Sequence, residues 1–173
     1  MKSIQEVQTT LYQLLKPDLN KKFYQISMDG MCVASLDLIN GEGSLARIET
    51  KDGSYTIKRQ GFFLPIVSIR RDKSDVDIST AMLDIRSKIN IVLDGMSYTF
   101  RLFELWKNQW GWVNDKNKPI VRYKLTNAGI IRGDIELSKE AIYMSNLALI
   151  ITIGVYFLIQ FEEELIKIND YGR

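Results

Sequence analysis

Basic side chains at alternating positions are the strongest candidates for chemistry in this sequence. Arg122 and Lys124 stand two residues apart in a β-rich segment, and a strand would point both to one face. Such a pair can hold a phosphate, Arg through its bidentate fork and Lys as a point charge. Adjacent cations at residues 58–59 and 70–71 would point to opposite faces. The alternative in each case is an ordinary solvated strand face. The candidate anion-binding residues are Arg122, Lys124, Arg70, Arg71 and Lys58.

Catalytic and metal-binding chemistry is restricted by the residue types that the chain lacks. It has no histidine and one cysteine, Cys32, which removes histidine triads, histidine metal sites, paired-cysteine redox motifs and cysteine-ligated zinc or iron–sulfur centres. Cys32 lies between Met31 and Val33, and we expect a buried structural thiol. Carboxylates, Lys and Tyr remain as general acids or bases, but they form no pattern that names a reaction. We expect no catalytic residue, metal or cofactor.

Acidic and aromatic residues form two further patterns that carry less weight. Asp75 and Asp77 could ligate a hard cation, but their segment lacks the Gly and Glu spacing of a calcium loop, and we expect a solvated loop. Trp106, Trp110 and Trp112 share even parity, so a continuous strand would place them on one face. Such a platform can stack bases, yet aromatic residues at this spacing are more often core residues. We expect a core role.

Composition and net charge restrict the partners. The chain has 173 residues, of which 46% are hydrophobic and 25% are charged, with a formal net charge of +2. These proportions are typical of a soluble globular domain. The small net charge gives no case for nucleic acid, which requires a concentrated basic footprint. The first residues lack the apolar region of a secretory signal. We therefore expect one cytoplasmic domain over residues 1–173.

The elements that would position these residues begin with an N-terminal segment, residues 1–21. Ser3 and Glu6 fit the capping box S-x-x-E, and apolar residues follow at helical spacing until Pro17. This pattern predicts a short amphipathic helix on the outside of the domain, although two threonines within it also suit a strand. Its polar face lacks the Lys and Arg of an interfacial helix, so a packed edge element is expected.

Residues 22–137 have the pattern of a meander of short strands. Apolar and polar residues alternate, and the Asp-Gly and Asn-Gly dipeptides between them tolerate the positive φ of tight hairpins. Short strands with a turn signal about every 8–12 residues indicate a β-sandwich or a barrel. The dipeptides are at residues 29–30, 40–41, 52–53 and 94–95. The predicted strands are residues 23–28, 31–38, 44–50, 54–59, 62–71, 82–84, 88–93, 96–106, 109–113, 119–126 and 130–137.

An uncharged apolar run at residues 147–159 decides the architecture. It is shorter than the about 20 residues of a membrane span, but the wider stretch of residues 141–161 approaches that length. A helix that is apolar on all sides lies in a large core or a membrane, and a barrel of more than about eight strands is too wide for its own side chains to fill. We therefore expect a mainly β fold with one helix inside: a closed antiparallel β-barrel of about twelve strands enclosing a hydrophobic C-terminal helix within residues 138–170, plus the short N-terminal helix.

Small polar residues within the apolar run favour a place inside the barrel. Thr152, Tyr156 and Gln160 recur at helical intervals, and each could hydrogen-bond to the enclosing sheet. Gly154 would let a strand approach the helix closely. These polar residues argue against a membrane anchor. The basic residues before the run and the acidic residues after it nevertheless suit an anchored protein.

Several short motifs resemble the tubby C-terminal-like superfamily, which includes phospholipid scramblases and LURP-one-related proteins. The resemblance covers residues 23–160 and implies a twelve-stranded barrel that encloses a hydrophobic C-terminal helix. The N-terminal segment and the acidic residues 162–164 have no counterpart in the family pattern. The motifs are Y-x-I-x-x-x-G at residues 24–30, A-x-I at 46–48, D-G-x-Y-x-I at 52–57, Y-x-F-R at 98–101 and W-x-W at 110–112.

The resemblance also implies a function, because tubby domains bind phosphoinositide headgroups through clustered Lys and Arg. We expect a non-enzymatic module that binds an anionic phospholipid at a membrane surface or a protein partner, with no nucleic acid. The oligomeric state is not indicated. Two alternatives stay open: a membrane protein anchored by residues 141–161, and an enzyme with a carboxylate site.

Overall fold

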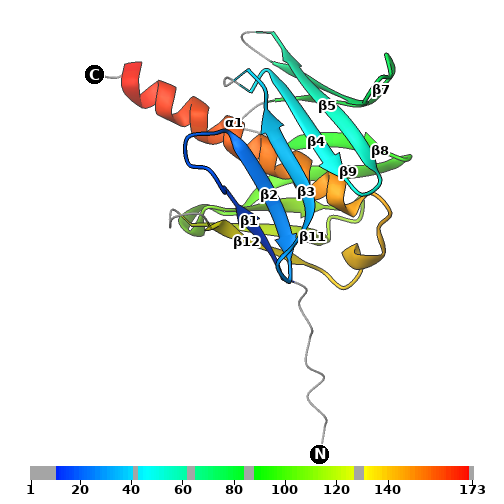
Figure 1. Cartoon of the computed structure of the whole chain (residues 1–173). Coiled ribbons are helices and arrows are strands. Elements are labelled where there is room, and N and C mark those ends of the chain that lie inside the picture. Colours follow the sequence, from blue (N-terminus) through cyan, green and yellow to red (C-terminus); the bar gives the residue numbers. More distant parts are fainter. Residues whose placement is uncertain (1–10, 41–42, 62–64, 84–87, 127–130, 172–173) are drawn as a thin grey trace, which may run out of the picture.

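The protein folds as a nearly closed antiparallel barrel of twelve strands with a helix running through it (Figure 1). The computed structural model describes residues 11–40, 43–61, 65–83, 88–126 and 131–171; the side chains of 106, 131 and 165–171 are outside that description. The predicted mainly β fold with a C-terminal helix is confirmed. The strands are β1 (Leu11–Leu15), β2 (Phe23–Met28), β3 (Met31–Leu38), β4 (Leu45–Thr50), β5 (Gly53–Gln60), β6 (Ile66–Arg71), β7 (Asp77–Met82), β8 (Ile89–Leu93), β9 (Met96–Glu104), β10 (Gln109–Val113), β11 (Pro119–Leu125) and β12 (Ile131–Leu137). The helices are η1 (Leu105–Lys107), η2 (Ala141–Tyr143) and α1 (Leu147–Tyr171).

Most strands pair with their neighbours in the sequence, and one additional pairing joins the first strand to the last. The sheet runs β7-β6-β5-β4-β3-β2-β1-β12-β11-β10-β9-β8, so the first strand joins the two halves by pairing with both β2 and β12. The far ends of the sheet, β7 and β8, pack side by side without a hydrogen-bonded ladder. This seam is where the barrel is nearly, rather than fully, closed.

The predicted N-terminal helix is wrong where the structure describes that segment. Residues 11–15 form β1, in which Leu14 is buried and Leu11 is exposed; residues 1–10 lie outside the described ranges. The helical spacing of the leucines was a local signal only. Without β1, the edges of β2 and β12 would each leave a row of unpaired backbone groups, and pairing with both of them outweighs helix propensity.

The tight hairpins at residues 29–30 and 94–95 were predicted correctly, whereas Gly41 of the predicted turn at residues 40–41 lies outside the described residues. Asp29 and Gly30 have φ of 51° and 78°, and Asp94 and Gly95 have φ of 51° and 75°, values that suit the two central residues of a type I′ turn. Nine of the eleven predicted strands start and end within two residues of the observed ones, and a tenth, residues 62–71, ends where β6 ends. Strand β7 was missed. Residues 72–80 read as a polar loop, whereas Asp77 begins a strand whose inward residues, Ser79 and Ala81, are small.

Helix α1 supplies the centre of the core. Its residues 149–161 are all buried, on every side of the helix, as expected for a helix enclosed by a sheet. Among the described residues, no helix combines the length and the apolar character needed to cross a membrane. Trp112 is fully buried, and half-buried Trp110 stacks on Phe100 and contacts Phe161, which agrees with the expected core role; the Trp106 side chain is not described.

Three buried hydroxyl groups on or beside α1 form hydrogen bonds within the barrel. The Tyr123 hydroxyl on β11 donates to the carbonyl oxygen of Ile151 at 2.8 Å, and the Tyr156 hydroxyl donates to that of Gly43 at 2.7 Å. The Thr152 hydroxyl donates back to Ala148 at 2.7 Å. These bonds satisfy hydroxyl groups that would otherwise be costly to bury.

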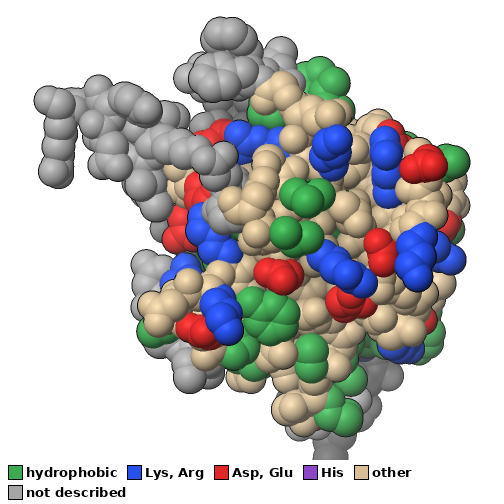
Figure 2. Space-filling model, turned by 45° about the horizontal axis from the view of Figure 1, so that its top comes forward, with side chains coloured by type: hydrophobic (Ala, Val, Ile, Leu, Met, Phe, Trp, Pro, Cys, Tyr) green, Lys and Arg blue, Asp and Glu red, His purple; other side chains and the backbone are tan. Residues whose placement is uncertain are grey.

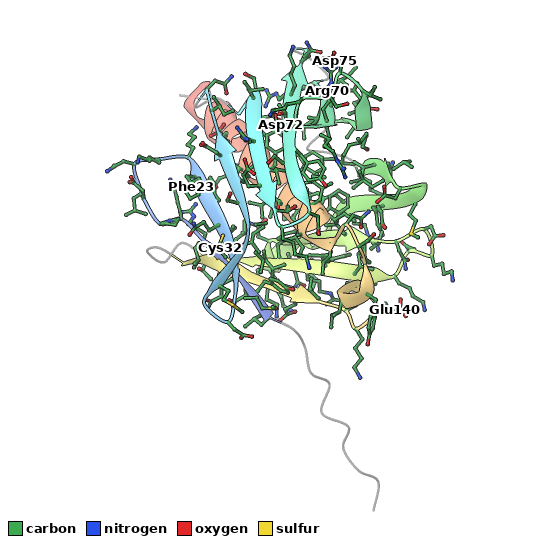
Figure 3. The ribbon with its side chains drawn as sticks, turned by 45° about the vertical axis from the view of Figure 1, so that its right-hand side comes forward. Phe23, Cys32, Arg70, Asp72, Asp75 and Glu140 are labelled. Atoms are coloured by element: carbon green, nitrogen blue, oxygen red, sulfur yellow. The ribbon has the colours of Figure 1, made fainter. Side chains whose placement is uncertain are left out.

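Cys32 is a second correction. The thiol was expected to be buried, but Cys32 is exposed near the hairpin between β2 and β3, and its Sγ is 3.4 Å from the carbonyl oxygen of Ala34 (Figure 3). The residue pairs with Ser27 beside a β-bulge that shifts the register between Ile26 and Ser27. A bulge changes which side chains face outward, and the neighbouring apolar residues gave no sign of it.

Gly154 is where α1 and the sheet come closest. A Cβ atom at this position would lie 2.2 Å from Tyr123 Oη and 2.6 Å from Trp112 Nε1. An alanine in a helix interior usually stabilises by about 1 kcal/mol relative to glycine. Here we expect Gly154→Ala to lower the free energy of unfolding by about 1–3 kcal/mol through overpacking, and Gly154→Asp to lower it by more, because an unpaired charge is buried. Urea denaturation measures both.

A double-mutant cycle identifies the contact responsible. Tyr123→Phe removes the oxygen nearest to the added Cβ atom, so Gly154→Ala should cost less in the Tyr123→Phe background than in the parent protein. Strictly additive effects, or a Gly154→Ala variant as stable as the parent, would contradict this account of the core.

Two buried tyrosines predict a loss of stability at high pH. Burial raises the pKa of Tyr123 well above its usual value, and burial likewise raises the pKa of Tyr156. The native state then keeps protons that the unfolded chain releases above about pH 10, so stability is complete below that pH and falls above it. We expect a slope of up to about 1.4 kcal/mol per pH unit for each tyrosine. Denaturation between about pH 8 and pH 12 measures it.

The matched variants are Tyr123→Phe and Tyr156→Phe, each of which should flatten the alkaline slope. Tyr143 is 89% exposed, and Tyr143→Phe serves as the control. If the slope is the same in the parent and in the two core variants, other groups cause the alkaline loss.

Candidate functional site

The outer face of β9, β10 and β11 carries a row of two arginines around a glycine. Arg101 on β9 and Arg122 on β11 are both register partners of Gly111 on β10. The three residues therefore lie side by side across the sheet, and Gly111 leaves an open place between the two long side chains. Phe103, two residues after Arg101, fills that place.

The Phe103 ring holds both arginines. A Cβ atom on Gly111 would lie 2.1 Å from the Val121 carbonyl oxygen and 2.3 Å from Phe103 Cε2, so both the neighbouring strand and the ring require glycine here. The guanidinium carbon of Arg101 is 5.5 Å from the ring centroid, and that of Arg122 is 5.4 Å away. Both distances are in the range of cation–π contacts. We call Arg101, Phe103 and Arg122 the Arg–Phe–Arg stack.

The two guanidinium groups of the stack have no carboxylate partner among the described residues. Neither guanidinium lies within 4 Å of a carboxylate that the structure describes. Glu136, the register partner of Arg122 on β12, pairs instead with Lys124 at 2.5 Å. Glu104 pairs with Lys107 at 2.7 Å, and that hydrogen bond is the main reason its pKa is lowered, with smaller contributions from Arg122 and Lys124.

Arg101 carries a buried N–H group that lacks a hydrogen-bond partner within the described part of the chain. Its Nε atom is buried and has no hydrogen-bond partner among the described residues. A buried N–H group without a partner is unfavourable, so Arg101 would gain from an acceptor that reaches it. The phenyl ring fixes the Arg101 side chain with this buried N–H group unpaired among the described residues.

A shallow groove adjoins the stack. It has a volume of about 270 Å³ and is lined by Pro119, Ile120, Arg122, Glu136, Leu137 and Ser138. Its walls are largely apolar, with Arg122 as the one cation among the lining residues. A ligand with an anionic group at the stack would therefore find apolar surface beside it.

The structure divides the five predicted cations between two sides of the barrel. Arg122 and Lys124 are exposed together on β11, as predicted. The other three lie on β5 and β6, from which β11 is separated by β4, β3, β2, β1 and β12 in one direction and by β7, β8, β9 and β10 in the other. The predicted residues therefore do not form one site.

The cations on β5 and β6 are less available. Arg70 pairs with Asp77 at 2.5 Å and lies beside Asp75 (Figure 3). Arg71 is 5.8 Å from the Tyr55 ring centroid, and Lys58 is exposed opposite Ser68. On the face drawn in Figure 2, basic and acidic side chains are interspersed. This mixture is typical of a solvated surface.

Arg101 and Phe103 were missed as site residues. The alternation of Tyr98, Phe100 and Leu102 places Arg101 on the outer face, so its outward direction could be predicted from the sequence. The pairing of β9 and β11 with the same glycine depends on the register of two hairpins, which residue patterns alone do not set.

The acidic residues 162–164 form ion pairs between α1 and the barrel. Glu162, Glu163 and Glu164 follow the last buried turn of α1 and pair with three different parts of the barrel rim: Arg132 at 3.6 Å, Lys22, and Arg59 at 3.5 Å. Arg59 also donates to the buried Gln160 Oε1 at 2.5 Å. We call these three ion pairs the rim clasp. It fastens the helix to the end of the barrel from which it emerges.

Neither the groove nor the rim clasp brings two carboxylates together for acid–base chemistry: one glutamate lines the groove, and each clasp glutamate faces a cation. Within the described part of the chain, no three metal-ligating side chains gather. Asp77, considered as a cation ligand, is engaged by Arg70 instead.

Comparison with protein-family models, with curated proteins and with solved structures gave no match to this chain. The described chain forms a nearly closed antiparallel barrel of twelve strands, with a C-terminal helix packed inside and the Arg–Phe–Arg stack on its outer wall.

Proposed function

We propose that this chain is a non-enzymatic, tubby-like barrel that binds the anionic headgroup of a phospholipid at a membrane surface. The Arg–Phe–Arg stack would be the headgroup site. Lys124 stands beside it on β11, and the adjoining groove would contact the apolar part of the lipid. The resemblance in motif order to the tubby-like proteins and the central helix support the assignment to that kind of barrel.

The observation that carries the proposal is the shared phenyl ring. Two long side chains normally lose conformational entropy when they bind a ligand, but Phe103 already holds both guanidinium groups. Each guanidinium offers several N–H donors in a planar fork that matches phosphate oxygens. The nearby carboxylates of Glu136 and Glu104 are occupied by lysines, so a phosphate would not have to displace them.

Vesicle co-sedimentation tests the proposal. Neutral phosphatidylcholine vesicles are compared with vesicles that also contain phosphatidylserine or a phosphoinositide. Each Lys or Arg near an anionic membrane contributes about 1 kcal/mol, so the double variant Arg101→Gln/Arg122→Gln should bind the anionic vesicles about 30-fold more weakly. Phe103→Leu keeps both charges but loses the ring, and it should also weaken binding.

The matched control removes two charges elsewhere. Lys58→Gln/Arg71→Gln has the same net charge as the stack variant, and its substitutions lie on the opposite side of the barrel. It should bind like the parent protein. Equal losses in the two variants would mean non-specific attraction, and binding that does not depend on anionic lipid would exclude the headgroup site.

A further inference from the structure

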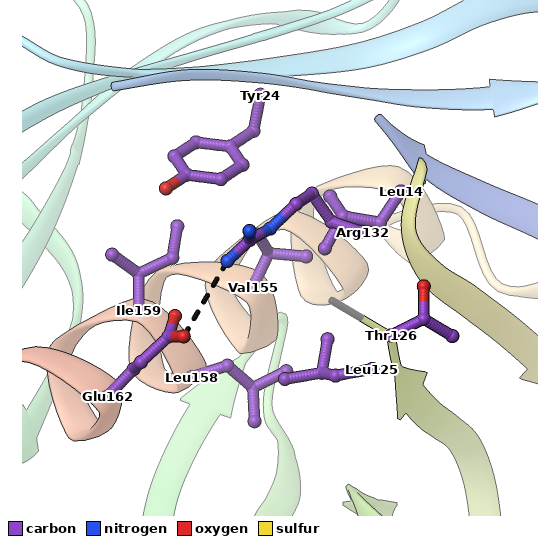
Figure 4. Close-up of a pocket in the computed structure, with 9 residues that line it drawn as sticks. All are labelled: Leu14, Tyr24, Leu125, Thr126, Arg132, Val155, Leu158, Ile159 and Glu162. Carbon is purple, nitrogen blue, oxygen red and sulfur yellow. Dashed lines mark ion pairs between the residues drawn. The ribbon is translucent and has the colours of Figure 1, made fainter. Parts of the chain in front are cut away.

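A small pocket lies beside α1, between the helix and strands of the barrel (Figure 4). None of its described lining residues belongs to the Arg–Phe–Arg stack or to the groove beside the stack. Most of its walls are apolar side chains, from α1 (Val155, Leu158 and Ile159), β1 (Leu14) and β11 (Leu125), and Tyr24 and Thr126 add two hydroxyl-bearing side chains. Arg132 and Glu162 reach toward each other across it. Among the described lining residues, the pocket thus combines a largely apolar wall with two hydroxyl-bearing side chains, one cation and one carboxylate.

A β-bulge directs Arg132 into this pocket. Leu14 pairs with Gly133 and Leu15 pairs with Ile131, so Arg132 is an extra residue on β12 opposite β1. Ile135 points into the core, and regular alternation would place Arg132 on the outside with Asp134 and Glu136. Its side chain instead lines the pocket. Bulges commonly redirect a side chain in this way next to functional sites.

Arg132 is the most weakly held cation of the rim clasp. Its side chain is only 25% exposed, yet its one carboxylate partner among the described residues is Glu162, at 3.6 Å. The structure describes no hydrogen bond from its guanidinium group. Arg59, by contrast, also bonds to Gln160 at 2.5 Å. Glu162 is 49% exposed, whereas Glu163 and Glu164 are 21% and 26% exposed.

We propose that this pocket is a second ligand site, in which Arg132 binds the carboxylate of a single-chain alkyl carboxylate in exchange for Glu162. Glu162 shows that a carboxylate fits opposite Arg132. A ligand carboxylate could approach more closely than a glutamate that is fixed to the helix, and it could form the bidentate pair that arginine favours. The site is separate from the headgroup site and does not depend on it.

The apolar lining and the size of the pocket define the tail. The pocket has a volume of about 30 Å³, enough for one or two water molecules, so the first carbons of a chain would fill it. Each buried methylene strengthens binding by about fourfold. Affinity should therefore rise over the first two or three carbons after the carboxylate, and further carbons that extend into solvent should add nothing.

Isothermal titration calorimetry with acetate, butanoate, octanoate and octan-1-ol tests the site. Affinity should rise from acetate to butanoate and change little from butanoate to octanoate, and octan-1-ol should bind at least tenfold more weakly than octanoate. Arg132→Gln should weaken octanoate binding at least tenfold. Octan-1-ol binding as tight as octanoate, or unchanged affinity in Arg132→Gln, would overturn the proposal.

Glu162→Gln gives the opposite prediction and does not require a folded Arg132 variant. Removing the internal competitor should strengthen octanoate binding several-fold; weaker binding would overturn the exchange. Lys22→Gln, which removes a rim cation paired with Glu163, is the matched control and should leave affinity within about twofold. Arg101→Gln/Arg122→Gln should also leave it unchanged, which distinguishes a failure of this site from a failure of the headgroup site.

Discussion

The enclosure of α1 by the sheet is the constraint on which the rest of the structure depends. A twelve-stranded barrel has an interior that its own side chains cannot fill, and a helix that is apolar around its circumference has no exposed face. Each needs the other. The contact is tightest at Gly154, where only a hydrogen atom separates the helix from Tyr123 and Trp112, so the fit depends on the absence of a side chain.

That constraint restricts where ligands can bind. The interior is occupied by α1 and by the aromatic residues around Phe100, so the outer wall and the two ends remain. On the wall, a glycine creates room for the phenyl ring that organises two arginines. At the exit end, an extra residue turns one arginine inward. Both places arise from a local departure from regular strand geometry rather than from the barrel itself.

Much of the fold could be predicted from residue patterns, because hairpins and strand alternation are local. The turns at Asp29-Gly30 and Asp94-Gly95 and the strands β2, β3 and β10 follow from short-range chemistry. The helix at residues 11–15 was predicted wrongly because pairing with β2 and β12 is a tertiary effect. The same reason explains the missed Arg101 and Arg132: cross-strand register and a bulge placed them, and neither is visible in one segment alone.

The position of β1 has a consequence for how the chain reaches this state. The first strand closes the barrel by pairing with the last one, although more than a hundred residues separate them in the sequence. During synthesis, β2 to β11 can form successive hairpins as they leave the ribosome, but β1 must wait for β12, and the sheet must wait for α1. Contacts between such distant segments slow folding and leave strand edges exposed meanwhile. The nascent barrel is thus an open, aggregation-prone sheet until β12 and α1 have been translated.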